Sequence, residues 1–196
     1  FGTENKEMLA KFIRKEVTEE EFVLDDIRLW REVQPDIHRD DIMRCYSGIK
    51  LMPGAREVVK ELQNRDILVA IVSSGVDLLI GSIANMLKVD DWAANGFEWD
   101  EEGWLIGSKP TVVQSHDKGI TVEKFARINS IDPENIVSVG DSGPDLSMMI
   151  PGSRFIGFNH APKRGAEDFV KAGVPIIEGQ DLRNIWQPMF GEPFPE

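Results

Sequence analysis

The chain has 196 residues, of which 41% are hydrophobic and 29% charged, and its 34 acidic and 22 basic residues give a formal net charge of −12. This length and composition suit one α/β domain with a small accessory lobe. The acidic excess argues against nucleic acid or an anionic membrane surface as the main partner, because a phosphate backbone is bound through clustered lysines and arginines. The acidic excess does not exclude a small phosphorylated ligand. The lone cysteine, the lack of a long apolar run and the lack of a recognisable signal peptide predict a cytoplasmic protein.

The N-terminal part, residues 8–50, predicts a small helical lobe. Pro35 interrupts this region, and a short helix is expected over 36–46. Apolar side chains recur there at helical spacing, namely Met8, Leu9, Phe12 and Ile13.

Strand and helix signals alternate over residues 51–196, which predicts an α/β fold with a doubly wound, mostly parallel Rossmann-like sheet. Uninterrupted apolar runs at 67–72 and 136–139 predict parallel strands covered on both faces. Pro53-Gly54 begins an amphipathic helix with Val58, Val59 and Leu62 on its apolar face. The other expected elements are helices near 77–87, 118–128 and 164–171, a hairpin over 97–106 turning at Gly103, and strands at 154–158 and 174–177. The proline-containing tail is expected to be irregular.

The first apolar strand ends in Ser73-Ser74-Gly75. A hydroxyl at a strand end, followed by amides at a turn into a helix, makes an anion-binding nest. Ser73 would hold a phosphate oxygen through its hydroxyl, while the Ser74 and Gly75 amides would hold others. In the alternative interpretation, one of the serines only caps the next helix.

Asp141 and Asp145 lie in a glycine- and proline-containing loop directly after the strand at 136–139. Such a loop suits Mg²⁺, which takes one or two carboxylates and completes its shell with water and substrate phosphate. In the alternative interpretation the loop is a turn, and Asp145 caps a helix over 146–150. Because ligands of open α/β sheets bind at the carboxyl ends of the strands, this loop and the serines are expected to meet.

Lys118 stands at the start of the helix expected near 118–128. A cation at a helix N-terminus opposes the macrodipole and needs a compensating anion or solvent. A bound phosphate would be that anion; an ordinary surface lysine is the alternative.

The strand ending at Ser73, the Lys118-Gly119 helix start and the Gly140-Asp141 loop together make the chain resemble the haloacid dehalogenase superfamily. Its second motif is a strand ending in Ser or Thr, its third a lysine, and its fourth a Gly-Asp followed by another Asp. The similarity is to the phosphoserine-phosphatase-like branch, which carries a small helical cap before the second motif, as at 8–50, and a hairpin between motifs two and three, as at 97–106.

The resemblance implies a Mg²⁺-dependent phosphomonoesterase acting on a small soluble phosphorylated metabolite through an aspartyl-phosphate intermediate. Asp145 would support either the metal's shell or the lysine, and the cap would close over the site. The site residues that the resemblance implies are Ser73 and Lys118 for catalysis, Ser74, Gly75 and Lys118 for substrate binding, and Asp141 and Asp145 for the metal.

The family's first motif, a strand ending in Asp-x-Asp-x-Thr that supplies the nucleophile and the acid/base, has no counterpart in these residues. Asp25-Asp26 and Asp40-Asp41 stand in polar helical surroundings and are interpreted as solvated charges. We expect the motif and its core strand, which would lie between the strands at 67–72 and 136–139, upstream of Phe1. Without that segment the chain is expected to be inactive.

Two alternatives follow from that departure. One is a binding or regulatory protein that kept the fold without the nucleophile. The other is a related enzyme that transfers phosphate to another acceptor or removes halide, although Lys118 with a Gly-Asp loop favours phosphate chemistry. Phosphoserine is one substrate candidate among amino-acid, sugar and cofactor phosphates. Arg28 and Arg31 either recognise the substrate from the cap or form a solvated helix face.

Overall fold

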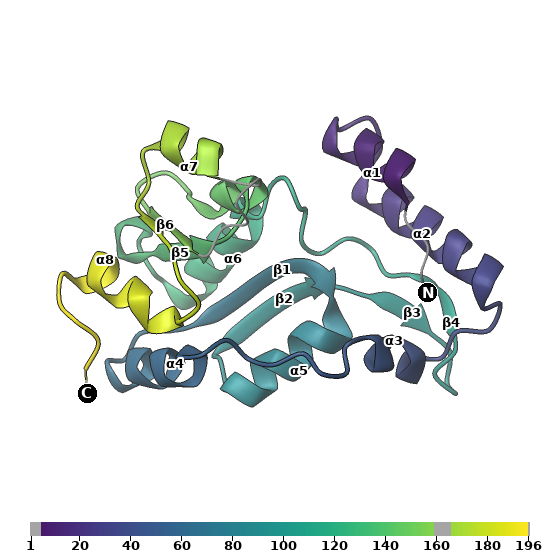
Figure 1. Cartoon of the computed structure of the whole chain (residues 1–196), viewed down its shortest axis with the longest axis horizontal. Coiled ribbons are helices and arrows are strands. Elements are labelled where there is room, and N and C mark those ends of the chain that lie inside the picture. The colour runs from purple at the N-terminus through teal and green to yellow at the C-terminus, as the bar shows by residue number, and fades with distance from the viewer. Residues whose placement is uncertain (1–4, 159–165, 196) are drawn as a thin grey trace. The chain divides into compact units, whose positions relative to one another are not determined.

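The computed structural model describes residues 5–158 and 166–195. The chain forms two compact units, one comprising 1–49, 73–82 and 93–114, the other 50–72, 83–92 and 115–196. The chain passes from one unit to the other after residues 49 and 114 and also inside three elements, which Figure 1 labels: β1 (Ala70–Val76), α5 (Asp77–Leu87) and β2 (Asp91–Asn95). Over the described part of the chain, no helix has the length and apolar character needed to cross a bilayer.

The helices of the first unit are α1 (Lys6–Ile13), α2 (Glu19–Val33) and α3 (Arg39–Cys45), and α1 packs on α2. Thr18 caps α2, because its hydroxyl accepts the Glu21 amide while the Glu21 carboxylate accepts the Thr18 amide. The short helix predicted over 36–46 is present as α3, but it begins later, with His38 as its cap.

A hairpin completes the first unit, with β3 (Phe97–Trp99) antiparallel to β4 (Leu105–Ser108), which confirms the predicted hairpin over 97–106. One buried apolar cluster of this unit combines side chains of α2, of α3 and of the segment between them with side chains of the hairpin: Ile27, Ile37, Ile42, Phe97 and Leu105. The first unit therefore joins most of the predicted cap, 8–50, to a hairpin from the predicted core, 51–196. The functional division at residue 50 stays a prediction.

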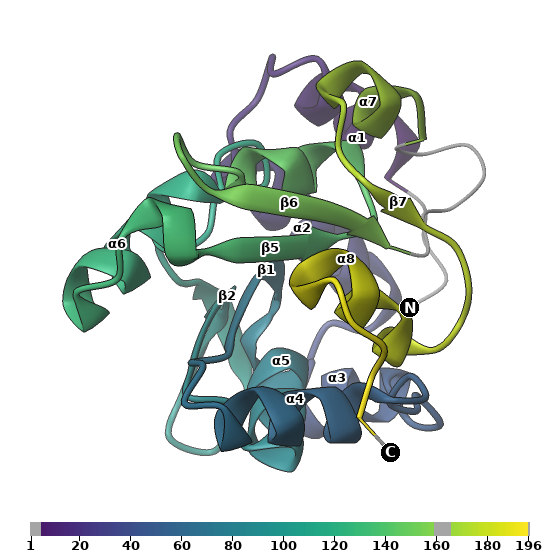
Figure 2. The same cartoon turned by 90° about the vertical axis from the view of Figure 1, so that its left-hand side faces the viewer.

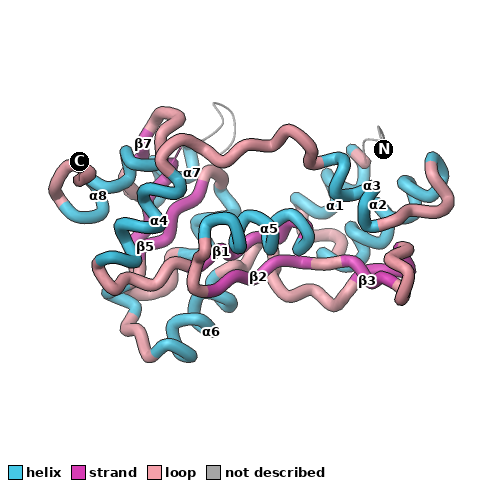
Figure 3. Tube along the Cα trace, turned by 90° about the horizontal axis from the view of Figure 1, so that it is seen from below, coloured by secondary structure: helices cyan, strands magenta, loops and turns pink. Residues whose placement is uncertain are grey.

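β1 and β2 lie side by side as a two-stranded sheet (Figure 3). The strand predicted at 67–72 begins three residues later, at Ala70, and the Val69 amide before it donates to the Asp90 carboxylate at 2.8 Å. The prediction that this run is covered on both faces was wrong, since no residue of β1 is buried and Leu68 is 49% exposed. Among the described strands β1 pairs only with β2, so fewer neighbours cover it.

The second unit contains a parallel sheet of three strands, with β6 (Arg154–Phe158) between β5 (Val137–Gly140) and β7 (Ile176–Ile177) (Figure 2). Successive β6 side chains alternate between two apolar clusters. Phe155 packs with Phe169 on one face, whereas Ile156 and Phe158 join a cluster with Trp186 on the other. Both faces of β6 are therefore covered, as expected of a parallel strand, and the predicted α/β class is confirmed.

The helical elements of the second unit are α4 (Ala55–Asn64), α6 (Gly119–Asn129), η1 (Pro133–Asn135), η2 (Gly143–Met148), α7 (Ala166–Ala172), η3 (Leu182–Ile185) and α8 (Trp186–Phe190). The predicted apolar face of α4 is buried: Val58, Val59 and Leu62. The start of the helix predicted at 164–171 lies outside the described residues. The prediction of an irregular tail was wrong over 182–190. Pro188 lies in the first turn of α8, where its missing N–H breaks no helical hydrogen bond.

Candidate active site

Lys118 and Asp145 form a buried ion pair in the second unit. The Lys118 Nζ lies 2.6 Å from the Asp145 Oδ1, and the two side chains are only 11% and 7% exposed. Lys118 immediately precedes α6, and Asp145 lies in η2, just beyond the end of β5. The anion that compensates a cation at this helix start is therefore a carboxylate of the protein itself.

The second carboxylate oxygen of Asp145 organises the loop after β5. Its Oδ2 accepts the Ser142 hydroxyl at 2.7 Å and the Ser142 and Asp141 amides at 3.0 and 3.1 Å. Because both oxygens already accept hydrogen bonds, the geometry favours Asp145 as the support of the lysine over a direct place on a metal. The role of Ser142 was missed, although Ser-x-x-Asp at a helix start is a recognisable capping signal.

Two glycines permit the close approach of this loop and α6. A Cβ at Gly140 would lie 2.4 Å from the Asp145 Cβ, and a Cβ at Gly119 would lie 2.5 Å from the Ser147 carbonyl oxygen. Both separations are shorter than side-chain carbons tolerate. Ser147 adds a link that the sequence did not reveal, since its hydroxyl accepts the Lys118 amide at 2.9 Å. The glycines beside Lys118 and Asp141 thus serve close packing.

The two aspartates have opposite pKa shifts. Loss of hydration raises the pKa of Asp141, and the negative charge of Asp145 raises it further. Burial also acts to raise the pKa of Asp145, but the hydrogen bond and charge of Lys118, together with the Ser142 bonds, outweigh it and hold that pKa below its usual value. Asp145 is therefore stabilised as an anion, whereas Asp141 is a carboxylate that lacks sufficient positive charge around it.

The shortage of positive charge around Asp141 makes its carboxylate suitable as a ligand for a hard cation. The Asp141 carboxyl group is partly desolvated and lies beside the negative charge of Asp145, and these surroundings favour a divalent ion. The described residues contain no group of three or more acidic, histidine or cysteine side chains able to enclose a metal. Mg²⁺ does not require such a cage, because it usually keeps several waters and takes one or two carboxylates.

Ser73, Ser74 and Gly75 lie in the first unit, inside β1, not in a turn after it. The predicted nest was wrong in this respect, because the strand continues to Val76 before α5 begins. The Gly75 amide donates to the Ser73 hydroxyl oxygen at 3.0 Å. A hydroxyl that accepts one bond keeps its own O–H to donate, so Ser73 can still bind a phosphate oxygen.

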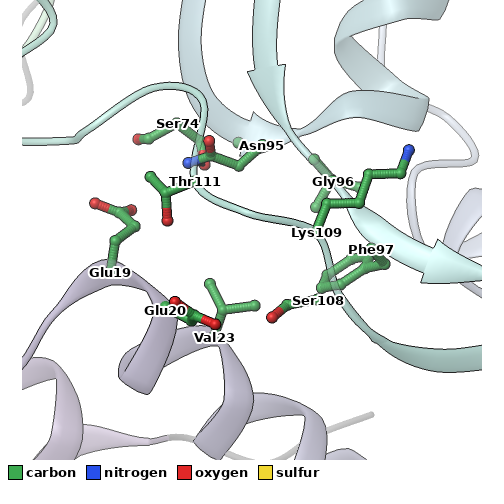
Figure 4. A pocket seen from close by; sticks show the side chains of 12 residues that line it. Glu19, Glu20, Val23, Ser74, Asn95, Gly96, Phe97, Ser108, Lys109 and Thr111 are labelled. Atoms are coloured by element: carbon green, nitrogen blue, oxygen red, sulfur yellow. Dashed lines mark hydrogen bonds between the residues drawn. The ribbon is translucent and has the colours of Figure 1, made fainter.

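A pocket opens beside Ser74 and Gly75 (Figure 4). Asn95 holds its wall together: its Nδ2 donates to the Ser74 and Val113 carbonyls at 3.3 and 2.8 Å, and its Oδ1 accepts the Val112 and Val113 amides. The pocket is lined by Glu19, Glu20, Val23, Ser74, Gly75, Val76, Asn95, Gly96, Phe97, Ser108, Lys109 and Thr111. Arg28 and Arg31 are not among these. Arg28 pairs with Asp25 and Glu32, and Arg31 donates to the Leu105 carbonyl at 2.6 Å.

The structure thus brings Lys118, Asp141 and Asp145 together within one unit. It places Ser74 and Gly75, but not Ser73, on the lining of a pocket in the other unit. That the two groups act on one phosphate stays a prediction. Fold and site define the class: an α/β protein with a lysine–carboxylate centre just beyond the end of a parallel strand.

Comparison with known proteins narrows that class to a family. The model of the haloacid dehalogenase-like hydrolases matches residues 7–149. The phosphoserine phosphatase of Methanocaldococcus jannaschii is 34% identical over 152 residues, which cover 76% of this chain and 69% of that protein. The chain therefore belongs to the haloacid dehalogenase-like hydrolases, in the branch of the phosphoserine phosphatases.

Further relatives differ in how much of their length the chain spans. The phosphoserine phosphatase of Archaeoglobus fulgidus is 31% identical over 159 residues, which cover 81% of this chain but only 45% of that protein. Among solved structures, a phospho-aspartyl intermediate analogue of phosphoserine phosphatase has a TM-score of 0.73 at 29% identity, covering 93% of this chain and 83% of that one.

Proposed function

We propose that the protein is a Mg²⁺-dependent phosphomonoesterase that hydrolyses a small phosphorylated metabolite through an aspartyl-phosphate intermediate. The observation that carries the proposal is the buried Lys118–Asp145 pair beside Asp141 at the end of β5. Family membership and the phospho-aspartyl analogue among the related structures support it. A cytoplasmic location belongs to the same proposal.

Lys118 supplies positive charge to the transferring phosphoryl group. An ammonium has three donors, and Asp145 accepts one of them, so two donors would be available to phosphate oxygens. Asp145 acts through Lys118 and the loop, and does not itself need to touch substrate. Ser73 would donate its hydroxyl to another phosphate oxygen. This set neutralises charge on the phosphoryl oxygens, which is the main demand of phosphoryl transfer.

The metal would be held by Asp141, with water and substrate oxygens completing its shell. When bound, Mg²⁺ supplies further charge neutralisation at the phosphate. The nucleophile would be the first aspartate of the family's first motif. Its carboxylate would form a bond to phosphorus as the ester P–O bond breaks and the alcohol leaves; water would then attack phosphorus, releasing inorganic phosphate and restoring the carboxylate.

Asp141 provides the sharpest test. In the natural full-length protein, Asp141→Asn should lower Mg²⁺-dependent hydrolysis of p-nitrophenyl phosphate about a hundredfold or more, because one charged ligand is lost. Removing Mg²⁺ with a chelator should abolish the wild-type activity, and added Mg²⁺ should restore it. The exposed Asp132 provides a control, as Asp132→Asn should change the rate less than twofold. Unchanged turnover in Asp141→Asn would refute the metal assignment, and a full-length protein without any phosphatase activity would favour a binding protein that kept the fold.

A further inference from the structure

Lys118 is attached to η2 at both ends of the residue. Its Nζ donates to the Asp145 Oδ1 at 2.6 Å, and its backbone amide donates to the Ser147 Oγ at 2.9 Å. Both acceptors belong to η2. The proposed function uses only the first of these bonds, which leaves the bond to Ser147 without an assigned role in the site.

The Ser147 hydroxyl connects the start of α6 to the backbone of η2. It donates to the Pro144 carbonyl at 2.7 Å while it accepts the Lys118 amide. A hydroxyl has one donor and two lone pairs, so the bond to Pro144 fixes the direction of the O–H and leaves the lone pairs for the Lys118 amide. Because Pro144 directly precedes Asp145, the backbone of Lys118 is held relative to the residue that accepts its ammonium.

The Lys118 amide needs an acceptor from outside its own helix. The first amides of a helix have no acceptor within it, and Lys118 is the residue that immediately precedes α6. A Cβ at Gly119 would lie 2.5 Å from the Ser147 carbonyl oxygen, so a glycine is required where α6 approaches η2 this closely. The close approach brings the Ser147 hydroxyl within reach of the Lys118 amide.

Two anchors determine the position of the Lys118 ammonium better than one. The side chain of a lysine is long and flexible, so it could keep its bond to Asp145 while the backbone moved, and the donors available to phosphate would then change direction. The Ser147 bond removes that freedom at the backbone end of the residue. Placement matters because a displacement of about 1 Å can lower the rate of a reaction about a hundredfold.

We infer that Ser147 is a positioning residue: its hydroxyl fixes the backbone of Lys118 and thereby places the ammonium for the phosphoryl group, without touching the substrate. This inference rests on the proposed function and adds to it a residue that acts only through Lys118. A merely structural role of Ser147 predicts lower stability and no loss of activity in the folded protein. The two roles are therefore separable by experiment.

Removing the hydroxyl in the natural full-length protein tests the inference. Ser147→Ala should lower kcat/KM for p-nitrophenyl phosphate about tenfold at a temperature where circular dichroism shows the variant folded, and Ser147→Thr, which keeps a hydroxyl, should stay within about threefold of wild type. Ser147→Cys, which keeps the shape but bonds weakly, should lose about three- to tenfold and replaces the alanine variant if that variant does not fold.

Ser153 provides the matched control. Its hydroxyl also donates to the carbonyl three residues earlier, that of Ile150 at 2.9 Å, but Ser153 lies outside η2. Ser153→Ala should therefore change kcat/KM less than twofold. An unchanged kcat/KM in Ser147→Ala, an equal loss in Ser153→Ala, or a loss that Ser147→Thr shares in full would overturn the inference.

Failure of the proposed function leaves a distinct signature, because it is seen in wild type. If wild type hydrolyses no ester, that function fails, and calorimetric titration with inorganic phosphate in the presence of Mg²⁺ tests the placement of Lys118 without catalysis. Binding that is about threefold or more weaker in Ser147→Ala, but not in Ser147→Thr or Ser153→Ala, supports the inference. Equal affinities in all variants, or no binding of phosphate by wild type, contradict it.

Discussion

At the scale of single residues, Asp145 accepts four hydrogen bonds through two oxygens: one from Lys118, one from the Asp141 amide and two from Ser142. These bonds join the N-terminus of α6 to the loop after β5. The arrangement holds the counter-ion of Lys118 in place, because the Asp145 carboxylate is itself fixed by backbone and hydroxyl donors.

Replacing Asp145 by Asn should destabilise the protein by about 3 kcal/mol, because Lys118 is left buried without its anion and one amide N–H₂ must face a donor. Urea unfolding followed by circular dichroism measures the change. The neighbouring exposed Asp117 supplies the control, since Asp117→Asn keeps the pair intact. A loss below about 1 kcal/mol in Asp145→Asn would mean that the pair contributes no more than a surface ion pair.

Asp25 and Asp26 share one donor but differ in environment. The Asn5 Nδ2 donates to the Asp25 Oδ2 and to the Asp26 Oδ1, both at 2.9 Å. Burial raises the pKa of Asp26, and the charge of Asp25 adds to this while Asn5 opposes it. The hydrogen bond from Arg28, followed by that from Asn5, lowers the pKa of Asp25. Neither aspartate is therefore the plain solvated charge that the sequence predicted.

These shifts predict opposite effects of pH. Folded Asp26 holds its proton more tightly than the unfolded chain, so its contribution to the unfolding free energy falls as pH rises from about 3.8 through the raised pKa. Asp26→Asn should therefore be more stable than wild type at neutral pH and not at the acidic end. Asp25 contributes stability above its unfolded pKa that is lost as pH falls through the lowered folded value, so Asp25→Asn should be less stable than wild type at neutral pH. Unfolding free energies from pH 3 to 7 provide the comparison, and differences of the same sign in both variants would contradict this account.

At the scale of elements, the C-terminal helix α8 shows how packing overrides a weak sequence signal. Trp186 is fully buried, with the Phe190 and Phe194 rings 4.5 and 5.0 Å away. The Arg65 guanidinium lies 4.8 Å from the Trp186 ring and pairs with Glu192. The prolines of this region suggested an irregular tail, whereas the aromatic spacing allows it to cover α4 and β6.

Trp186→Ala should destabilise the protein by about 3–5 kcal/mol, the usual effect of removing a fully buried large aromatic side chain. Thermal and urea unfolding measure it. Trp92, in the same unit but 41% exposed, is the matched position, and Trp92→Ala should cost about 1 kcal/mol or less. Equal losses in the two variants would show that the tail does not contribute to the core.

Hydrophobic patterning predicted most elements because it reports local periodicity. The α4 helix, α5, the β3–β4 hairpin and β6 were found at or within two residues of the predicted positions. The patterning failed on burial at β1, where an uninterrupted apolar run is covered incompletely. The burial of a strand depends on which elements pack against it, and the local amino-acid sequence of the strand does not specify those elements.

At the scale of the whole molecule, the chain passes between its two units inside β1, α5 and β2. The helices α2 and α3 share an apolar core with a hairpin some fifty residues or more further along the chain. Sequence order suggested a cap that ends near residue 50. Contacts between segments distant in sequence, such as Ile27 with Phe97 in one cluster, govern the compact grouping.

The sequence by itself determined the α/β class and the family and singled out Lys118, Asp141 and Asp145 as candidate site residues, because strand ends and helix starts are marked by short-range patterns of apolar residues, glycines and charges. Only the tertiary structure decided that Asp145 supports Lys118, that Ser73 and Gly75 bond to each other within a strand, and that Glu19 and Glu20 face a pocket. Those facts depend on distances between atoms that are far apart along the chain, which folding sets and local patterns do not encode.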